Sequence, residues 1–193
     1  VNGVQAGQST EWYENGQPSR QELWTSGEVL ETLTWHENGN RKEELRTHNG
    51  QIHRIVWSPA GQKIHETNGN TVSEWRIDGT QKSEQIRLRD GQVQMTEHHL
   101  NGSPASQITI DLAGKHVSPP LTWFDNGNLK SENHWEGQKL DGPAKLWHSN
   151  GNLKESGFLV EGLLNGLVRT FFSNGQLQQE VEHAYGVVSY THL

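Results

Sequence analysis

The stretch Leu121-Thr-Trp-Phe-Asp-Asn-Gly-Asn-Leu-Lys-Ser-Glu132 decides the fold of this chain, because it recurs from end to end. Its aromatic residue, Trp123, precedes Asn126 by three residues, and the pattern returns 24 residues later at Trp147 and again 24 residues later at Phe171. The complete column ahead of the turns reads Trp12, Trp35, Trp57, Trp75, His98, Trp123, Trp147 and Phe171. Six of the eight tryptophans therefore occupy one repeat position, which identifies the chain as a repeat array.

Each copy of the pattern predicts a β-hairpin, since Asn-Gly between alternating segments is the strongest short-range hairpin signal. A three-residue loop, Asp125-Asn126-Gly127, pairs Trp123 with Leu129 and needs Gly127 in the left-handed conformation, as it needs Gly151 and Gly175 in the next two copies. With uninterrupted alternation, the predicted apolar face collects Leu121, Trp123, Leu129 and Trp135. The predicted polar face collects Lys130, Glu132, Lys154, Gln178 and Glu180.

The repeats predict an all-β chain, an extended twisted antiparallel meander of about eight hairpins. Five hairpins are expected in residues 1–112 and three more in residues 121–193, as one continuous array. Residues 113–120 are expected to form an irregular joint, because the consecutive prolines Pro119 and Pro120 cannot both lie inside a strand ladder. The column aromatics and the turn glycines are the expected structural residues of the repeat.

Composition limits the classes of function. The net charge of −7 argues against nucleic acid binding, which needs clustered Lys and Arg. The chain has no cysteine and no apolar run of the roughly 20 residues that a membrane helix needs. Because it starts at Val1 and not at Met, we expect that a leader or another segment precedes it in the full protein.

No arrangement of residues predicts catalysis. The sequence contains no Gly-x-Ser-x-Gly elbow, no phosphate-binding loop and no His-Glu-x-x-His helix motif. His98 and His99 are adjacent in a predicted strand and point to opposite faces, so we expect sheet-surface histidines and no metal. We therefore expect a protein that is not an enzyme and that uses neither a metal nor a cofactor.

The run from Trp135 to Gly157 resembles the bacterial variant of the MORN repeat, in which an aromatic-x-x-Asn-Gly-x-Leu-Lys-x-Glu hairpin recurs about every 23 residues. Trp123–Glu132, Trp147–Glu155 and Phe171–Glu180 match this pattern closely, and the earlier copies match it more loosely. The resemblance implies a long meander with one hairpin per repeat. Proteins of this kind are described as antitoxins or as immunity proteins against secreted effectors, lipases among them, whereas other MORN proteins are scaffolds or contact membrane lipids.

A single-layer sheet also exposes side chains that a partner can bind. The predicted contact surface consists of Phe124, His148 and Phe172, with Asp125, Glu132 and Glu180 around them. Exposed aromatic residues beside acidic ones are typical of interface centres. The other interpretation, that these aromatics pack only on neighbouring strands, is equally compatible with the sequence.

Together these features predict an immunity or antitoxin protein that binds a cognate toxic effector, with a secreted lipase among the implied targets. The alternative is a scaffold or envelope-binding module that recognises lipid head groups or glycan. We expect a periplasmic or envelope-associated location, with the cytoplasm as the alternative.

Overall fold

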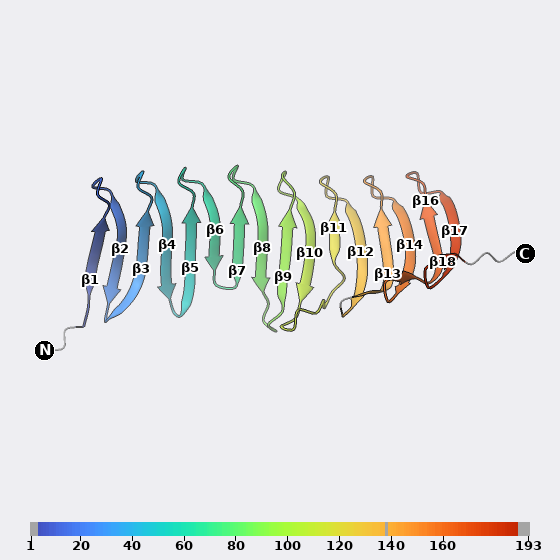
Figure 1. Cartoon of the computed structure of the whole chain (residues 1–193), viewed down its shortest axis with the longest axis horizontal. Helices are drawn as coiled ribbons and strands as arrows, with labels where there is room; N and C mark the ends of the chain where they lie inside the picture. Colours follow the sequence, from blue (N-terminus) through green and yellow to red (C-terminus); the bar gives the residue numbers. More distant parts are fainter. Residues whose placement is uncertain (1–3, 138, 189–193) are drawn as a thin grey trace, which may run out of the picture. The chain divides into compact units, whose positions relative to one another are not determined.

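The chain is all β, as predicted. A computed structural model describes residues 4–137 and 139–188, and these residues form 18 strands and no helix. The strands divide into two compact units, Val1–Ile86 and Arg87–Leu193. In each unit, strands that follow one another along the chain pair antiparallel, so the predicted meander of hairpins is confirmed (Figure 1).

The first unit is a meander in which each strand pairs with the next one. The tip turns, at Asn15-Gly16, Asn38-Gly39, Ala60-Gly61 and Asp78-Gly79, lie on one side of this unit in Figure 1, and the return turns lie on the other. Its strands are β1 (Gly7–Trp12), β2 (Pro18–Thr25), β3 (Glu28–Trp35), β4 (Arg41–His48), β5 (Gln51–Trp57), β6 (Lys63–Asn68), β7 (Thr71–Trp75) and β8 (Gln81–Arg87).

The second unit continues the same design. Its strands are β9 (Val93–His98), β10 (Pro104–Ile110), β11 (Leu121–Trp123), β12 (Leu129–Glu136), β13 (Lys139–Trp147), β14 (Leu153–Val160), β15 (Leu163–Leu164), β16 (Gly166–Phe171), β17 (Leu177–Ala184) and β18 (Val187–Val188). Strands β15 and β16 both pair with β14, so they act as one strand that is interrupted at Asn165. Residues 111–120, between β10 and β11, contain a tight turn and one isolated bridge, from Ile110 to His116.

The tip turns have the predicted geometry. The Gly127 N–H donates to the Phe124 carbonyl at 2.9 Å, and the Phe124 N–H donates to the Asn128 carbonyl at 2.8 Å. The Asn126 side chain accepts a hydrogen bond from the Asn128 N–H at 3.0 Å. Gly127 has φ of 85°, so the glycine supplies the left-handed residue that closes the three-residue loop. Trp123 pairs with Leu129, as expected.

The return turns are shorter. Ser26 and Gly27 both have positive φ, at 51° and 82°, and so do Asn49 and Gly50, at 50° and 74°. Two successive left-handed residues define a type I′ turn, whose twist matches that of the strands it joins. These two return turns therefore differ from the tip turns, whereas the turn at Asp90-Gly91 repeats the tip pattern, with the Leu88 N–H bonded to the Gln92 carbonyl at 2.8 Å.

The predicted division of side chains between the two faces is wrong, because the strand that leaves each tip carries an extra residue. Trp123 pairs with Leu129, but Thr122 pairs with Ser131, so Lys130 is a bulge. A one-residue shift moves every later side chain to the other face. Glu132 consequently lies opposite Leu121, on the same face, and not on a separate polar face.

The sheet has almost no interior. Val168 is the one described apolar residue that is buried, at 7% exposure. An alanine Cβ at Gly157 would lie 3.2 Å from the Val168 side chain, so the glycine leaves the space that Val168 fills. With no second layer to bury side chains against, the repeats depend on contacts between neighbouring hairpins.

We predict that Gly127→Ala lowers the free energy of unfolding by about 1–2 kcal/mol, because an L-residue at this φ is strained although the added methyl meets no atom within 4 Å. Urea denaturation followed by circular dichroism measures the change. Ser149→Ala is the control, since Ser149 contacts the neighbouring tip through its backbone carbonyl, which the substitution keeps. Equal stability of the Gly127→Ala variant and the wild type would contradict the strained-turn explanation.

Candidate binding surface

Where a tip turn carries asparagine and another tip follows it, the asparagine side chain joins the two. Asn126 Nδ2 donates to the Ser149 carbonyl at 2.7 Å, and Asn128 Nδ2 donates to the same oxygen at 2.8 Å. Asn150 and Asn152 repeat this arrangement one hairpin later, on the Ser173 carbonyl, at 2.6 and 2.7 Å. We call these side chain-to-carbonyl contacts between successive tips the tip ladder. The Asn-Gly motif thus has two roles, since it closes its own turn and holds the next one.

A second row of the tip ladder uses the residue that follows the column aromatic. His148 Nε2 lies 2.9 Å from the Phe171 carbonyl, and His99 Nε2 lies 2.9 Å from the Trp123 carbonyl. In the first unit, Tyr13 Oη donates to the Trp35 carbonyl at 2.7 Å and His36 contacts the Trp57 carbonyl at 3.1 Å. The Tyr13 hydroxyl and the imidazoles at this position therefore bond to the backbone of the next hairpin, whereas the Ser58 hydroxyl bonds to Gln62 in its own hairpin.

The structure separates the predicted contact residues by role. The imidazole of His148 belongs to the tip ladder, so the fold uses this side chain. Phe124 is half-buried under Lys130, whose Nζ lies 5.8 Å from the ring centroid.

Phe172 is 48% exposed, and Asp125 is exposed at a tip where its carbonyl accepts hydrogen bonds from Asn101 and Ser103. Contact of these residues with a partner stays a prediction.

Two of the three predicted acidic residues, Glu132 and Glu180, lie away from the tips, on one face of the second unit. The strand pairings align one row across this face: Leu121, Glu132, Lys145, Ser156, Arg169 and Glu180. We call it the charged face. Glu180 accepts a hydrogen bond from Arg169 Nε at 2.6 Å, so its charge is partly neutralised. Glu132 lies directly opposite Lys145.

The column aromatics end the first strands of the tip hairpins. Trp12 is 64% exposed, whereas Trp35, Trp57, Trp75, Trp123, Trp147 and Phe171 are half-buried. Cations cover two of these rings, with Lys63 Nζ 3.9 Å from the Trp75 ring and Arg41 Cζ 5.3 Å from the Trp35 ring. The Lys63 contact joins the third hairpin to the fourth, so this part of the column links neighbouring repeats.

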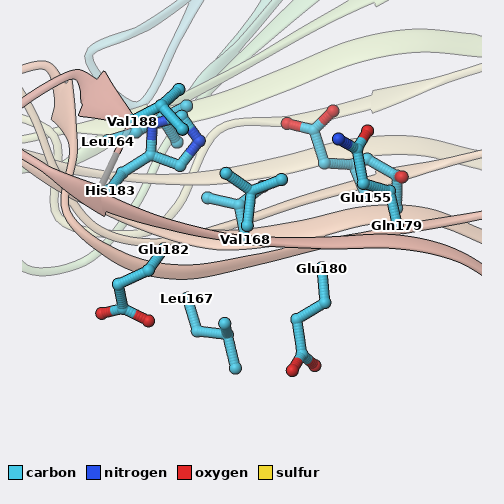
Figure 2. A pocket seen from close by; sticks show the side chains of 11 residues that line it. Glu155, Leu164, Leu167, Val168, Gln179, Glu180, Glu182, His183 and Val188 are labelled. Atoms are coloured by element: carbon cyan, nitrogen blue, oxygen red, sulfur yellow. The ribbon is translucent and has the colours of Figure 1, made fainter. Parts of the chain in front are cut away.

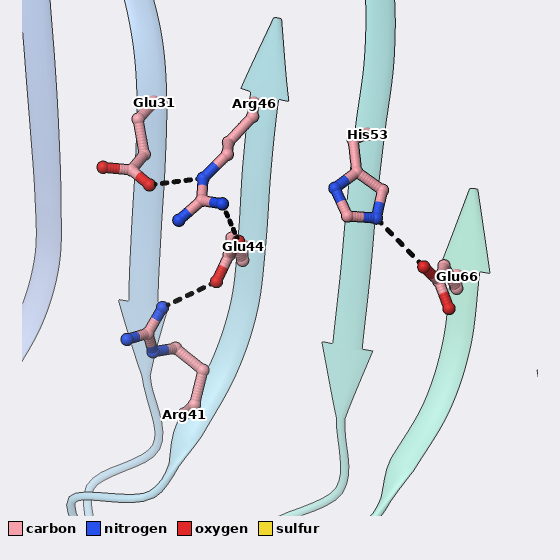
Figure 3. Close-up of polar contacts among 6 residues, drawn as sticks. All are labelled: Glu31, Arg41, Glu44, Arg46, His53 and Glu66. Carbon is pink, nitrogen blue, oxygen red and sulfur yellow. Dashed lines mark hydrogen bonds and ion pairs between the residues drawn. The ribbon is translucent and has the colours of Figure 1, made fainter. Parts of the chain in front are cut away.

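Charges on the first unit neutralise one another. Arg46 bonds to Glu31 at 2.6 Å and lies 3.2 Å from Glu44, which also pairs with Arg41 at 3.0 Å (Figure 3). The hydrogen bond that Arg46 donates to the Glu31 carboxylate is the main cause of a raised Arg46 pKa. A nearby group of the same face has Glu66 between two donors, Lys63 at 2.8 Å and His53 at 3.0 Å. These carboxylates already have cations, so they do not form a free acidic site.

The second unit contains a pocket of about 800 Å³ against β14–β18. Figure 2 shows Glu155, Val168, Gln179 and His183 on one side of the ribbon, and Leu167, Glu180 and Glu182 on the other. Strand pairing agrees with this view, because Glu155 opposes Thr170 and Thr170 opposes Gln179. Each of these three residues is next in sequence to a residue of the charged face, so its side chain points to the opposite side of the sheet. We call the side with Glu155 the pocket face. Its floor is apolar and consists of Leu164, Val168, Val181 and Val188.

The polar groups of the pocket face are not neutralised in the described part of the chain. Within residues 4–137 and 139–188, no Lys, Arg or His nitrogen lies within 4.0 Å of the Glu155 carboxylate. Thr170 and Gln179 have no side-chain hydrogen bond to another described residue. The buried His183 Nδ1 has no hydrogen-bond partner either. An open pocket with unused oxygen acceptors differs from the paired charges of the first unit.

Two stretches of the chain, residues 140–159 and 164–184, match the family model of the MORN repeat variant. MORN repeats are therefore present, and they contain every pocket-lining residue except Val188. A search of the curated proteins finds no match to the chain. The described residues include no helix with the length and apolar character needed to cross a bilayer.

Sequence reasoning did not single out Glu155, although a signal for it exists. Glu132 and Glu180 follow their column aromatics, Trp123 and Phe171, by nine residues, whereas Glu155 follows Trp147 by eight. Because strand side chains alternate, this one-residue difference places Glu155 on the other face of the sheet.

The tip ladder predicts the effect of an isosteric change. Asn126→Asp keeps the oxygen that accepts the Asn128 N–H but replaces the donor to Ser149 with a carboxylate oxygen, which repels the carbonyl. We expect a loss of about 1–3 kcal/mol of unfolding free energy in urea denaturation. Asn174→Asp is the matched control, because Asn174 Nδ2 bonds within its own turn, to Gln176. A similar loss in both variants would show that the bond between hairpins is not responsible.

The Glu66 contacts predict a pH-dependent contribution to stability. Hydrogen bonds from Lys63 and then His53 hold the Glu66 pKa below its ordinary value of 4.5. The folded state therefore releases this proton more readily, so the contribution is complete above pH 4.5 and is lost as pH falls through the folded pKa. We expect Glu66→Gln to cost about 0.2–1 kcal/mol at neutral pH and progressively less as the pH falls below 4.5.

Denaturation of the wild type and the Glu66→Gln variant across this pH range measures the difference. Glu84→Gln is the control, because Glu84 lies in the same cross-strand row and has no ion pair among the described residues. A Glu66→Gln effect that does not change with pH would contradict the ionic explanation.

Proposed function

We propose that this MORN-repeat protein is a non-enzymatic immunity or antitoxin protein that binds a cognate toxic effector and blocks it. The observation that carries the proposal is the single-layer sheet, which buries one described apolar residue and leaves large hydrophobic side chains such as Phe158, Leu167 and Phe172 exposed. Such a fold leaves most of its side chains at the surface, and extended repeat surfaces are suited to binding other proteins.

The net charge of the chain indicates which kind of partner surface it favours. At −7 the chain favours encounter with a basic surface, since opposite charges steer association. An effector with a basic face, such as a secreted lipase of that kind, fits this requirement. A periplasmic or envelope location brings the protein to such an effector, and we propose that location over the cytoplasm.

Co-expression tests the proposal directly. We expect the protein to rescue growth of cells that express the toxic effector encoded beside its own gene, and to copurify with that effector as a stable complex. Protection has to depend on binding, so a variant that no longer copurifies has to lose protection as well. Growth arrest in the presence of the folded protein would overturn the proposal.

Pull-downs test the scaffold or envelope-binding alternative. An acidic protein is repelled by anionic lipid, so we expect no retention on phosphatidylserine vesicles or on peptidoglycan. Retention on either material, together with failure to bind the effector, would favour the alternative.

A further inference from the structure

We infer, on the basis of the protein-binding function proposed above, that the pocket face receives an arginine side chain of the protein partner, with the Glu155 carboxylate as its counter-ion. The pocket lies on β14–β18 and has a volume of about 800 Å³, which accommodates a long side chain together with its flanking backbone.

The charge of the occupant follows from Glu155. This half-buried carboxylate has no cation within 4.0 Å among the described residues. Glu43 provides the comparison, because it follows its column aromatic Trp35 by the same eight residues and is paired with Arg54 at 2.5 Å. The chain therefore supplies the cation at one copy of this position and leaves it to another molecule at the other.

The shape of the cation follows from the neighbouring acceptors. Glu155, Thr170 and Gln179 are successive partners across β14, β16 and β17, so three side chains with oxygen acceptors stand in one row. Adjacent strands are about 4.8 Å apart, a spacing that the planar guanidinium with its five N–H donors can bridge. An ammonium group is a point charge and cannot satisfy a row of acceptors as well.

The apolar floor suits the rest of an arginine side chain. Val168 and Val181 lie in the next row of the pocket face, and Leu164 and Val188 flank it. Methylene groups of arginine commonly pack on such surface while the charged end contacts polar groups. His183 closes this end of the pocket.

A titration that needs no effector tests the pocket itself. The probe is N-acetyl-arginine methylamide, followed by the methyl NMR signals of Val168 and Val181, and the control probe is the isosteric, uncharged N-acetyl-citrulline methylamide. We expect saturable shifts with the arginine probe at millimolar concentration, shifts at least about tenfold weaker with the citrulline probe, and loss of the arginine response in Glu155→Gln. Equal responses to the two probes, or an unchanged response in Glu155→Gln, would overturn the inference.

Binding to the effector then separates the two proposals. If the wild type binds the effector, we expect Glu155→Gln to weaken the complex about 10–100-fold while Glu97→Gln, at an exposed position of β9 in the same unit, changes it less than about threefold. An equal loss in both variants, or no loss in Glu155→Gln, would overturn the inference while the proposed function stands. If the wild type does not bind the effector, the proposed function fails, and the arginine titration alone tests whether the pocket binds an arginine side chain.

Discussion

A hydrogen bond from one tip turn to the next is the interaction on which this structure depends. In a single-layer sheet, few side chains are buried, so packing alone gives weak control over how one hairpin sits against another. The amide of Asn126 reaches the Ser149 carbonyl, 23 residues away, and the amide of Asn150 reaches the Ser173 carbonyl at the same separation. The same bond forms across 21 residues from Asn38 to Pro59 and across 24 residues from Asn101 to Asp125, so it connects successive tips although the segments between them differ in length.

The sequence was sufficient to predict the turns, the pairing of Trp123 with Leu129 and the meander, because Asn-Gly turns and their spacing are local signals. It was not sufficient for the faces. The bulge at Lys130 leaves no composition signal, and one extra residue transfers Glu132 to the face of Leu121. The structural use of His148 was also missed, since its acceptor, the Phe171 carbonyl, is visible only when successive tips are placed side by side.

The two units use charged residues in different ways. In the first unit, Arg46, Glu44 and Glu66 take part in ion pairs within the sheet, which satisfy the charges locally. In the second unit, the MORN-repeat segment leaves Glu155 without a cation from any described residue, beside an apolar floor. A repeat fold allows this difference because the copies share a backbone design while their face residues vary independently. The tips thus connect successive hairpins, whereas the proposed arginine pocket lies on a face of the sheet.

Hydrogen exchange of asparagine side-chain amides tests the importance of the tip ladder most directly. Asn126, Asn128, Asn150 and Asn152 each donate from Nδ2 to the carbonyl of the next tip, whereas Asn174 Nδ2 bonds to Gln176 in its own turn. We expect the four ladder amides to exchange with solvent more slowly in NMR spectra than the amide of Asn174. Equal exchange rates for all five side chains would contradict a structure held together at its tips.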